Sequence, residues 1–268
     1  MKITVKNFKR ISEGEVDLAD LTILIGSNNS GKTSFVQAIQ FSVSAAQTLQ
    51  LQNTSWYNHQ RTQTTSLSSE DFLYTPTKDV AILHHKTRLR QGKGLISVKF
   101  ERDGIESILT LKKGKLKGIT TSLTGKQLGT QINSLQTTFC AYVPGLAGVS
   151  LHERYQPEIE IRKSCVRGDS NRYLRNVLLR IKSSADEESW KNFLESVRNV
   201  YPNTDLKVEY DEAKSEYITC LTKSGNRYLP IDSAGTGVLQ TIQIFAYLEY
   251  FKPTLFLLDE PDSHLHPS

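Results

Sequence analysis

Residues 26–33, GSNNSGKT, stand between the apolar run 21–25, LTILI, and an amphipathic stretch that begins with Phe35 and Val36. This order predicts a strand, a loop and then a helix over residues 32–49. A G-x-x-x-x-G-K-[ST] pattern in that context is typical of a loop that cradles phosphate. The two glycines permit a tight turn, so that backbone N–H groups converge on an anion at the helix N-terminus.

Two residues of this loop have expected roles of their own. Lys32 is expected to contact the β- and γ-phosphates as a point charge, and Thr33 to offer its hydroxyl to Mg²⁺. The competing interpretation is a glycine-containing strand-to-helix turn that binds nothing. The predicted nucleotide-binding residues are Gly26, Ser27, Asn28, Asn29, Ser30, Gly31, Lys32, Thr33 and Ser34.

A short apolar run at residues 255–258, LFLL, ends in the acidic pair Asp259 and Glu260. Such a run is typical of a fully buried parallel strand, whose C-terminal end is where ligands bind in open α/β sheets. We expect Asp259 to hold Mg²⁺ and Glu260 to orient or deprotonate the attacking water. Lys32 and Glu260 are then the predicted catalytic residues. A solvated strand end without function is the alternative.

A second anion-binding corner is predicted at residues 232–237, DSAGTG, which open an apolar helix over residues 238–250. A serine and two glycines at a helix N-terminus favour an anion, with Ser233 or Asp232 as the N-cap. One nucleotide needs one cradle, so we expect a head-to-tail pair of subunits in which each corner closes the nucleotide of the other. The residues expected to act in trans are Ser233, Ala234, Gly235, Thr236 and Gly237.

These three motifs, in this order, resemble those of ABC-class AAA ATPases, and within them the branch of RecF-like and OLD (overcoming lysogenisation defect) proteins. In that branch the signature is similar to residues 235–240, GTGVLQ, and the acidic motif is similar to residues 259–267, DEPDSHLHP. Residues 3–9, ITVKNFK, and 142–145, YVPG, are also similar to segments of the branch. The resemblance covers both ends of the chain well and the middle poorly.

The resemblance implies an α/β fold, an ABC-type P-loop NTPase core with a mixed β-sheet flanked by helices. We expect a single domain over residues 1–268, with its core at 1–50 and 203–268 and an inserted β-hairpin and helical region at about 51–202. ABC-class enzymes continue with another core strand and a switch histidine, and OLD proteins continue with a Toprim nuclease. We therefore expect a C-terminally truncated piece of a longer protein. The alternative is a naturally short chain whose missing strand weakens both the sheet and catalysis.

The same resemblance implies binding of ATP and hydrolysis of its phosphoric anhydride bond, with ATP and Mg²⁺ as cofactors and a homodimer formed around ATP. Hydrolysis is expected to drive or gate a DNA transaction in bacterial anti-phage defence or DNA repair, with a nuclease as partner or as the missing domain. The alternative is a nucleotide-dependent scaffold with negligible turnover, which the absent switch histidine favours. A membrane-transporter ATPase subunit fits less well, because the chain has no recognisable LSGGQ signature.

The composition is that of an ordinary globular protein, with 38% hydrophobic and 23% charged residues among 268. The net charge of +5 and the pI near 9.0 are compatible with nucleic-acid contact without requiring it. Three widely spaced cysteines form neither a metal pattern nor a disulfide framework, and no signal segment or membrane span is recognisable. These features predict a cytoplasmic protein that does not associate with a membrane.

Between the motifs, Asp103 and Gly104 separate two alternating runs and predict a hairpin. A second hairpin is expected near Gly114, where crowded lysines form either a basic finger for a phosphate backbone or a charged sheet edge. These lysines are Lys112, Lys113, Lys115 and Lys117.

The remaining elements are predicted more coarsely. Residues 153–202 are expected to form a helical hairpin with Asp169 and Asp186 as N-caps, and residues 50–69 a loop. His264 and His266 suggest either a metal pair or a segment near the subunit interface. The hairpin arginines, which face either solvent or a partner, are Arg172, Arg175, Arg180 and Arg198. Further strands are expected at residues 3–8, 14–18, 22–25, 80–83, 139–143, 206–210, 217–222 and 227–231.

Overall fold

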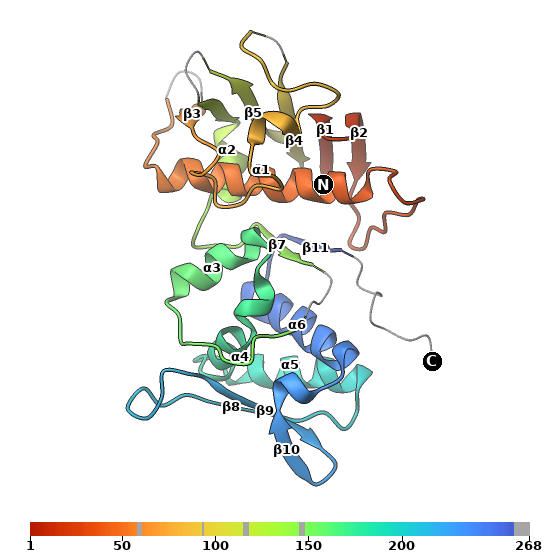
Figure 1. Cartoon of the computed structure of the whole chain (residues 1–268), viewed down its shortest axis with the longest axis vertical. Helices are drawn as coiled ribbons and strands as arrows, with labels where there is room; N and C mark the ends of the chain where they lie inside the picture. Colours follow the sequence, from red (N-terminus) through yellow and green to blue (C-terminus); the bar gives the residue numbers. More distant parts are fainter. Residues whose placement is uncertain (58–60, 93, 115–117, 145–147, 260–268) are drawn as a thin grey trace. The chain divides into compact units, whose positions relative to one another are not determined.

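The computed structural model describes residues 1–57, 61–92, 94–114, 118–144 and 148–259 (Figure 1). The chain forms two compact units, Met1–Phe139 and Cys140–Ser268. The division falls inside the predicted insertion, and the assignment of a single domain to the whole chain stays a prediction. None of the helices in the described ranges combines the length and the apolar character needed to cross a bilayer.

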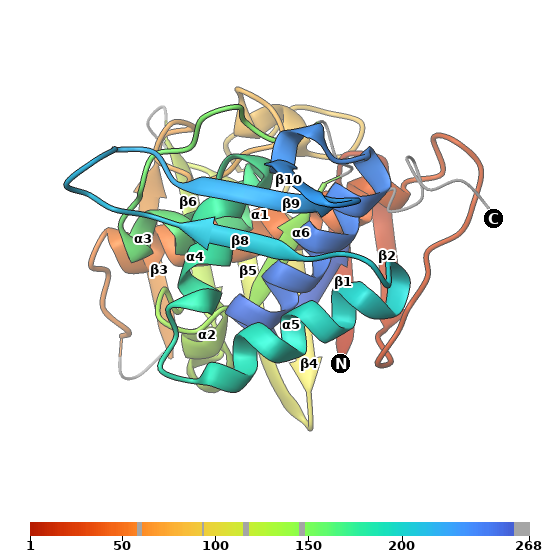
Figure 2. The same cartoon turned by 90° about the horizontal axis from the view of Figure 1, so that it is seen from below.

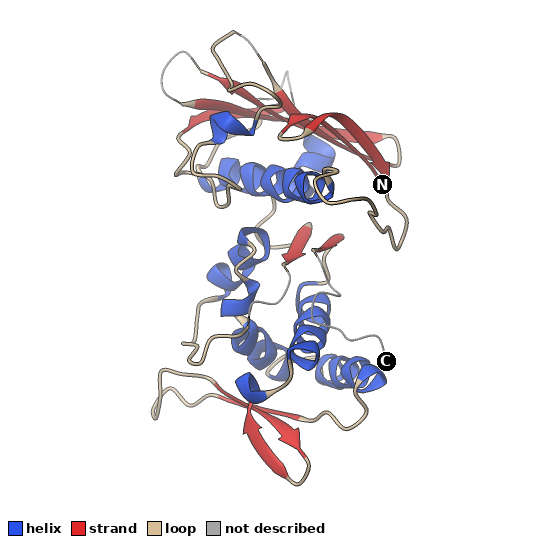
Figure 3. Ribbon diagram, turned by 45° about the vertical axis from the view of Figure 1, so that its right-hand side comes forward, coloured by secondary structure: helices blue, strands red, loops and turns tan. Residues whose placement is uncertain are grey.

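The first unit is built on a six-stranded antiparallel sheet, with helices packed on one face (Figure 3). From edge to edge the strand order is β2-β1-β4-β5-β6-β3. The strands are β1 (Lys2–Phe8), β2 (Ile11–Asp17), β3 (Thr62–Leu67), β4 (Ile96–Arg102), β5 (Ile105–Lys113) and β6 (Ile119–Thr124). The helices on this face are α1 (Lys32–Leu51) and α2 (Lys126–Ile132).

The sheet forms its core through the alternation of side chains along each strand. In β4 the buried residues Ile96, Val98 and Phe100 alternate with half-buried neighbours, and in β5 Leu109 and Leu111 are buried in the same way. Val98 lies directly opposite Leu109, so the apolar face is continuous across the two strands. Helix α1, which begins at the predicted residue, is buried along most of its 20 residues.

Both predicted hairpins are confirmed. Strand β4 turns into β5 through Asp103 and Gly104, whose φ angles of 54° and 75° are typical of a two-residue type I′ turn. Strand β5 turns into β6 after Gly114, whose N–H donates to the Gly118 carbonyl at 3.1 Å. The structure describes two lysines of this turn, Lys112 and Lys113. The other two, Lys115 and Lys117, lie outside the described residues.

The strand predicted at residues 22–25, before the phosphate loop, is wrong. Residues 21–25 are irregular, and Leu21, Ile23 and Ile25 are 79%, 73% and 88% exposed. An extended run becomes a strand only when a neighbour supplies partners for its N–H and C=O groups. Across the described ranges no strand pairs with this run. The apolar pattern indicates which side chains seek burial, but it does not supply that neighbour.

Two further segments differ from the expectation. Val80–Leu83 form a 3₁₀ helix, η1, and not a strand, because the Asp79 carboxylate accepts the Ala81 N–H at 2.9 Å and caps its start. The predicted loop at 50–69 contains strand β3, which pairs with β6 at the sheet edge. Its sequence, TQTTSL, has no apolar alternation, and only its β-branched threonines favour a strand.

In its described residues, the second unit contains a parallel strand pair, four α-helices and a three-stranded antiparallel sheet of order β10-β9-β8 (Figure 2). The pair is β7 (Cys140–Val143) and β11 (Leu255–Leu258), and the sheet strands are β8 (Leu206–Glu209), β9 (Thr219–Ser224) and β10 (Arg227–Pro230). The helices are α3 (Glu158–Arg167), α4 (Leu174–Lys182), α5 (Glu187–Val200) and α6 (Thr236–Phe251). Helix α6 packs against α4 and α5, and its Tyr247 is completely buried.

Strand β11 is parallel to β7, as predicted, with Leu257 opposite Tyr142. Its expected full burial is wrong, because only Leu257 is buried and Leu258 is 36% exposed. Within the described residues β11 has one neighbour, so its other edge has no strand to cover it.

The two predicted helix caps have different outcomes. Asp186 caps α5, because its carboxylate accepts the Glu188 N–H at 3.1 Å. Asp169 does not cap α4, since the short 3₁₀ turn η2 (Ser170–Arg172) intervenes. The N-cap of α4 is Tyr173, which makes no side-chain cap bond.

The three cysteines, Cys140, Cys165 and Cys220, are free thiols buried in the second unit. Burial raises the pKa of the Cys220 thiol to about 12, and it also raises the pKa of the Cys140 and Cys165 thiols. A buried, protonated thiol is a weak nucleophile, so the burial of these side chains favours a role in packing.

Candidate functional site

The loop before α1 has a backbone that favours glycine. Gly31 is the N-cap of α1 with φ 103°, and Gly26 has φ 158°. A Cβ atom at Gly26 would lie 2.8 Å from the Ser30 hydroxyl oxygen, and the positive φ strains any larger residue at this position. The Ser30 N–H donates to the Ser27 carbonyl at 3.2 Å and closes a turn. The exposed residues of this turn are Ser27, Asn28, Asn29 and Ser30.

The Lys32 ammonium is folded back onto this loop. Its Nζ donates to the Gly26 carbonyl at 2.6 Å and to the Ser27 carbonyl at 3.0 Å. A charged phosphate oxygen is a stronger partner for an ammonium than a neutral carbonyl, so an anion in the loop would compete for Lys32. Thr33 is exposed and Ser34 is half-buried in the same helical turn.

The N-terminus of α1 is electrostatically prepared for an anion. No side chain caps the helix, and its first turn contains no acidic residue. The first N–H groups of a helix have no partner within it, and they carry a partial positive charge. A lysine in this turn adds to that charge and is unfavourable unless an anion balances it. The geometry therefore agrees with a phosphate site.

We expect Gly26→Ala to weaken ATP binding by at least about tenfold with the fold retained, because an added Cβ is strained at the φ of Gly26 and crowds the Ser30 hydroxyl inside the loop. Titration with a fluorescent ATP analogue measures the affinity, and thermal unfolding measures the fold. Gly92→Ala is the matched control, since Gly92 also has a positive φ, of 70°, but nothing lies within 4 Å of its added Cβ. Equal affinities of Gly26→Ala and wild type would contradict the assignment of this loop.

Asp259 follows β11, and its carboxylate has a partner that the sequence did not indicate. Tyr142 donates its hydroxyl to Oδ2 of Asp259 at 3.3 Å, and the Asp259 N–H donates to the Val143 carbonyl at 3.2 Å. Both partners come from β7, because β7 and β11 are parallel and end at the same edge. Outside the described residues lie Glu260, His264 and His266.

The corner before α6 has no side-chain cap. Its N-cap is Gly235, so the prediction of Asp232 or Ser233 as the cap is wrong. The Ser233 hydroxyl donates instead to the backbone carbonyl three residues earlier at 2.6 Å, and Asp232 accepts a bond from Arg175 at 2.8 Å. The first turn of α6 contains no acidic residue. The exposed residues of the corner are Ser233, Gly235 and Thr236.

The predicted site residues divide between the two units. The phosphate loop belongs to the first unit, and Asp259 and the corner belong to the second. A shared site that also includes Lys32 stays a prediction. Sequence reasoning missed two partners: Tyr142, which it noted only within a resembling segment, and Arg175, which it noted only as one of several helix arginines.

A family model described as an AAA ATPase domain matches residues 1–141, just over half of the 268 residues. The chain belongs to this AAA ATPase family. Comparison with curated proteins gives no match. Membership of the family supports ATP binding and hydrolysis as its general activity. The mixed α/β architecture agrees with an AAA ATPase domain.

The region that matches the AAA ATPase family includes the phosphate loop and ends before the corner and Asp259. The family match therefore covers only one part of the predicted site, the phosphate loop. The RecF-like and OLD branch, the trans arrangement and the individual site residues stay predictions.

Proposed function

We propose that this AAA ATPase binds and hydrolyses ATP·Mg²⁺ as a head-to-tail homodimer. ATP joins the phosphate loop of one subunit to the Ser233–Gly235 corner of the other, and hydrolysis releases the pair. Positioning and charge stabilisation supply most of the catalysis, as is general for phosphoryl transfer.

The observation that carries this proposal is the pair of glycine-containing helix starts, at α1 and α6, that both lack a side-chain cap. Gly235 has φ −58°, which any residue adopts, and a Cβ there would meet nothing within 4 Å. The fold of this chain therefore does not require glycine at this position. A phosphate that approaches the backbone closely does require it.

The chemistry of the predicted site residues suits ATP·Mg²⁺. Lys32 supplies positive charge to the phosphates, Thr33 a hydroxyl and Asp259 a carboxylate, the oxygen ligands that Mg²⁺ prefers. Bound Mg²⁺ neutralises charge on the β- and γ-phosphates. Tyr142 holds the Asp259 carboxylate through its hydroxyl at 3.3 Å, and Glu260 takes the proton of the attacking water.

We further propose that the ATPase acts on DNA, together with a nuclease, in bacterial anti-phage defence or DNA repair. The support is the resemblance to RecF-like and OLD proteins and the net charge of +5. Exposed Lys112, at the β5–β6 hairpin, adds a cation that suits a phosphate backbone.

The proposed dimer is tested by the mass of the purified chain in light scattering, with and without ATP·Mg²⁺. We expect ATP to double the mass of the wild type, and Lys32→Ala to abolish the doubling because the loop loses its charge for the phosphates. Lys6→Ala, which removes an exposed lysine of β1, is the control. A wild-type mass that ATP leaves unchanged would contradict the proposal.

A further inference from the structure

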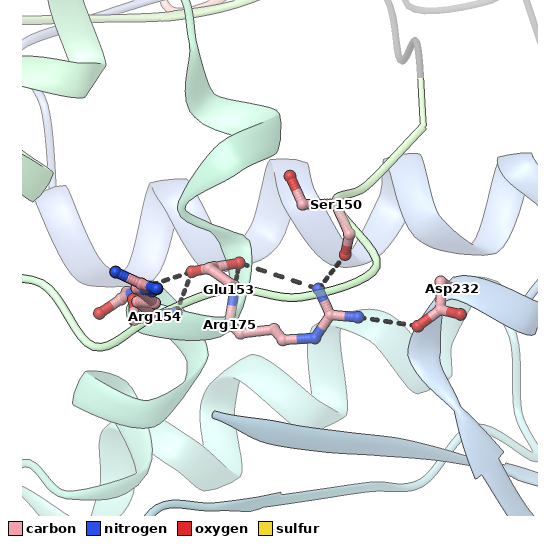
Figure 4. A network of polar contacts seen from close by, with 6 residues as sticks. Ser150, Glu153, Arg154, Arg175 and Asp232 are labelled. Atoms are coloured by element: carbon pink, nitrogen blue, oxygen red, sulfur yellow. Dashed lines mark hydrogen bonds and ion pairs between the residues drawn. The ribbon is translucent and has the colours of Figure 1, made fainter. Parts of the chain in front are cut away.

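Arg175 lies in the first turn of α4 and is almost completely buried, with 4% of its side chain exposed. Its guanidinium contacts two stretches of the chain, residues 150–153 and the turn that contains Asp232 (Figure 4). Nη2 donates to Oδ1 of Asp232 at 2.8 Å, and Nη1 donates to the backbone carbonyl of Ser150. Nη1 lies 4.0 Å from Oε2 of Glu153, so Asp232 is the nearer acidic group.

Glu153 has its own hydrogen-bond partners at the start of α4. Its carboxylate accepts the backbone N–H groups of Arg175 at 2.9 Å and of Asn176 at 2.7 Å, and the Asn176 side-chain amide at 2.7 Å. It therefore supplies the cap that Tyr173 lacks, at the positive end of the helix dipole. Burial raises the pKa of the Glu153 carboxyl, and these hydrogen bonds oppose the rise.

A buried guanidinium destabilises the fold unless its charge is paired. Because Glu153 is engaged with the N–H groups of α4, the pairing falls mainly to Asp232, which is 57 residues away in the sequence. Asp232 is 24% exposed and belongs to the 3₁₀ turn η3 (Ile231–Ser233). Arg175 thus ties α4 to the turn that leads into α6.

The direction of the negatively charged Asp232 carboxylate determines whether the start of α6 is free to bind a phosphate. Asp232 lies three residues before the N-cap Gly235, and the partial positive charge of a helix start attracts a nearby carboxylate. Here the carboxylate is bonded to Arg175, and α6 has no side-chain cap. A free carboxylate at this corner would repel a phosphate and compete with it for the same N–H groups.

We propose that Arg175 is a positioning residue for the corner. It neutralises Asp232 and holds its carboxylate away from α6, so that Ser233 and Gly235 meet a phosphate without a competing anion. This inference rests on the proposed function and deepens it, because it names the group that keeps the corner ready for a nucleotide.

The test compares the full chain with Arg175→Gln, Asp232→Asn and the double variant, by light scattering over a range of ATP·Mg²⁺ concentrations. Arg175→Gln leaves the Asp232 carboxylate without its cation, so we expect half-maximal dimerisation to need at least about tenfold more ATP. The double variant also lacks the carboxylate, and we expect its requirement to return to within about threefold of wild type. A role in packing alone would not give this recovery.

Two controls separate the corner from the fold and from the phosphate loop. Arg180→Gln changes the same helix, where Arg180 pairs with Glu158 at 3.4 Å, and is expected to dimerise as the wild type does. Affinity for a fluorescent ATP analogue, measured at protein concentrations where the chain is a monomer, is expected to be unchanged in all variants. Thermal unfolding shows whether each variant is folded.

Dimerisation of folded Arg175→Gln at the wild-type ATP concentration would overturn the inference, and so would a loss that Asp232→Asn fails to reverse. If Arg175→Gln does not fold, the folded double variant decides, because it lacks both the buried cation and its partner. An ATP requirement within about threefold of wild type supports the inference, and a larger requirement overturns it. If ATP does not dimerise the wild-type chain, the proposed function is refuted. Failure of the proposed function is thus distinguished from failure of the inference about Arg175.

Discussion

Replacing Glu260 by glutamine is expected to lower ATP turnover by about 100-fold or more while the ATP-bound dimer persists. Glutamine has nearly the shape of glutamate but cannot accept the proton of the attacking water. The phosphate loop, Asp259 and the corner are unchanged, so binding and dimerisation continue. Phosphate release measures the turnover, and light scattering with ATP·Mg²⁺ measures the lifetime of the dimer.

Asp262→Asn is the matched control, since it removes a carboxylate two residues further along the same segment, where no role is assigned. It is expected to turn over ATP at the wild-type rate. If Glu260→Gln also kept that rate, Glu260 would not be the base. If the wild type and both variants dimerised with ATP but turned over none, the scaffold function would replace the enzymatic one.

Mixing two inactive variants is expected to restore activity, because each proposed site takes its loop from one subunit and its corner from the other. Lys32→Ala disables the loop, and Gly235→Glu places a carboxylate at the corner, where the added side chain meets no neighbour at its Cβ. A mixed dimer keeps one intact loop facing one intact corner. Because Lys32→Ala alone is not expected to dimerise, the activity comes from mixed dimers with one working site of two, and at most about half of the wild-type turnover is expected.

Steady-state phosphate release of each variant alone and of the equimolar mixture measures this effect. A second mixture, in which one subunit carries both changes and the other is Lys32→Ala, is the control, since no mixed dimer then has a loop with its lysine. Absence of recovery in the first mixture, with both variants folded, would show that the corner does not act in trans.

Features that depend on neighbouring residues could be predicted from the sequence. The β4–β5 hairpin follows from Asp103 and Gly104, because these residues tolerate the positive φ angles of its turn. The cap of α5 follows from Asp186, and the turn at the start of α1 follows from Gly26 and Gly31. In each case the partner atoms lie within a few residues, so the local sequence contains the whole interaction.

Features that depend on distant partners could not be predicted. The Tyr142 hydroxyl and Asp259 are 117 residues apart, and no local pattern indicates their contact. The cap of α4 comes from Glu153, which precedes the helix by more than 20 residues, so the nearer Asp169 was the wrong choice. The predicted strand at 22–25 had the right apolar period, but strand formation also requires a neighbouring strand.

The exposed run LTILI has a consequence for handling the protein. Leu21, Ile23 and Ile25 are uncharged, alternate along the run and are mostly exposed. Short segments of this composition stack into cross-β aggregates, in which identical copies supply one another's backbone partners. Self-association through this run needs no nucleotide and favours precipitation as the protein is concentrated. We therefore expect the segment before α1 to limit the solubility of the isolated chain.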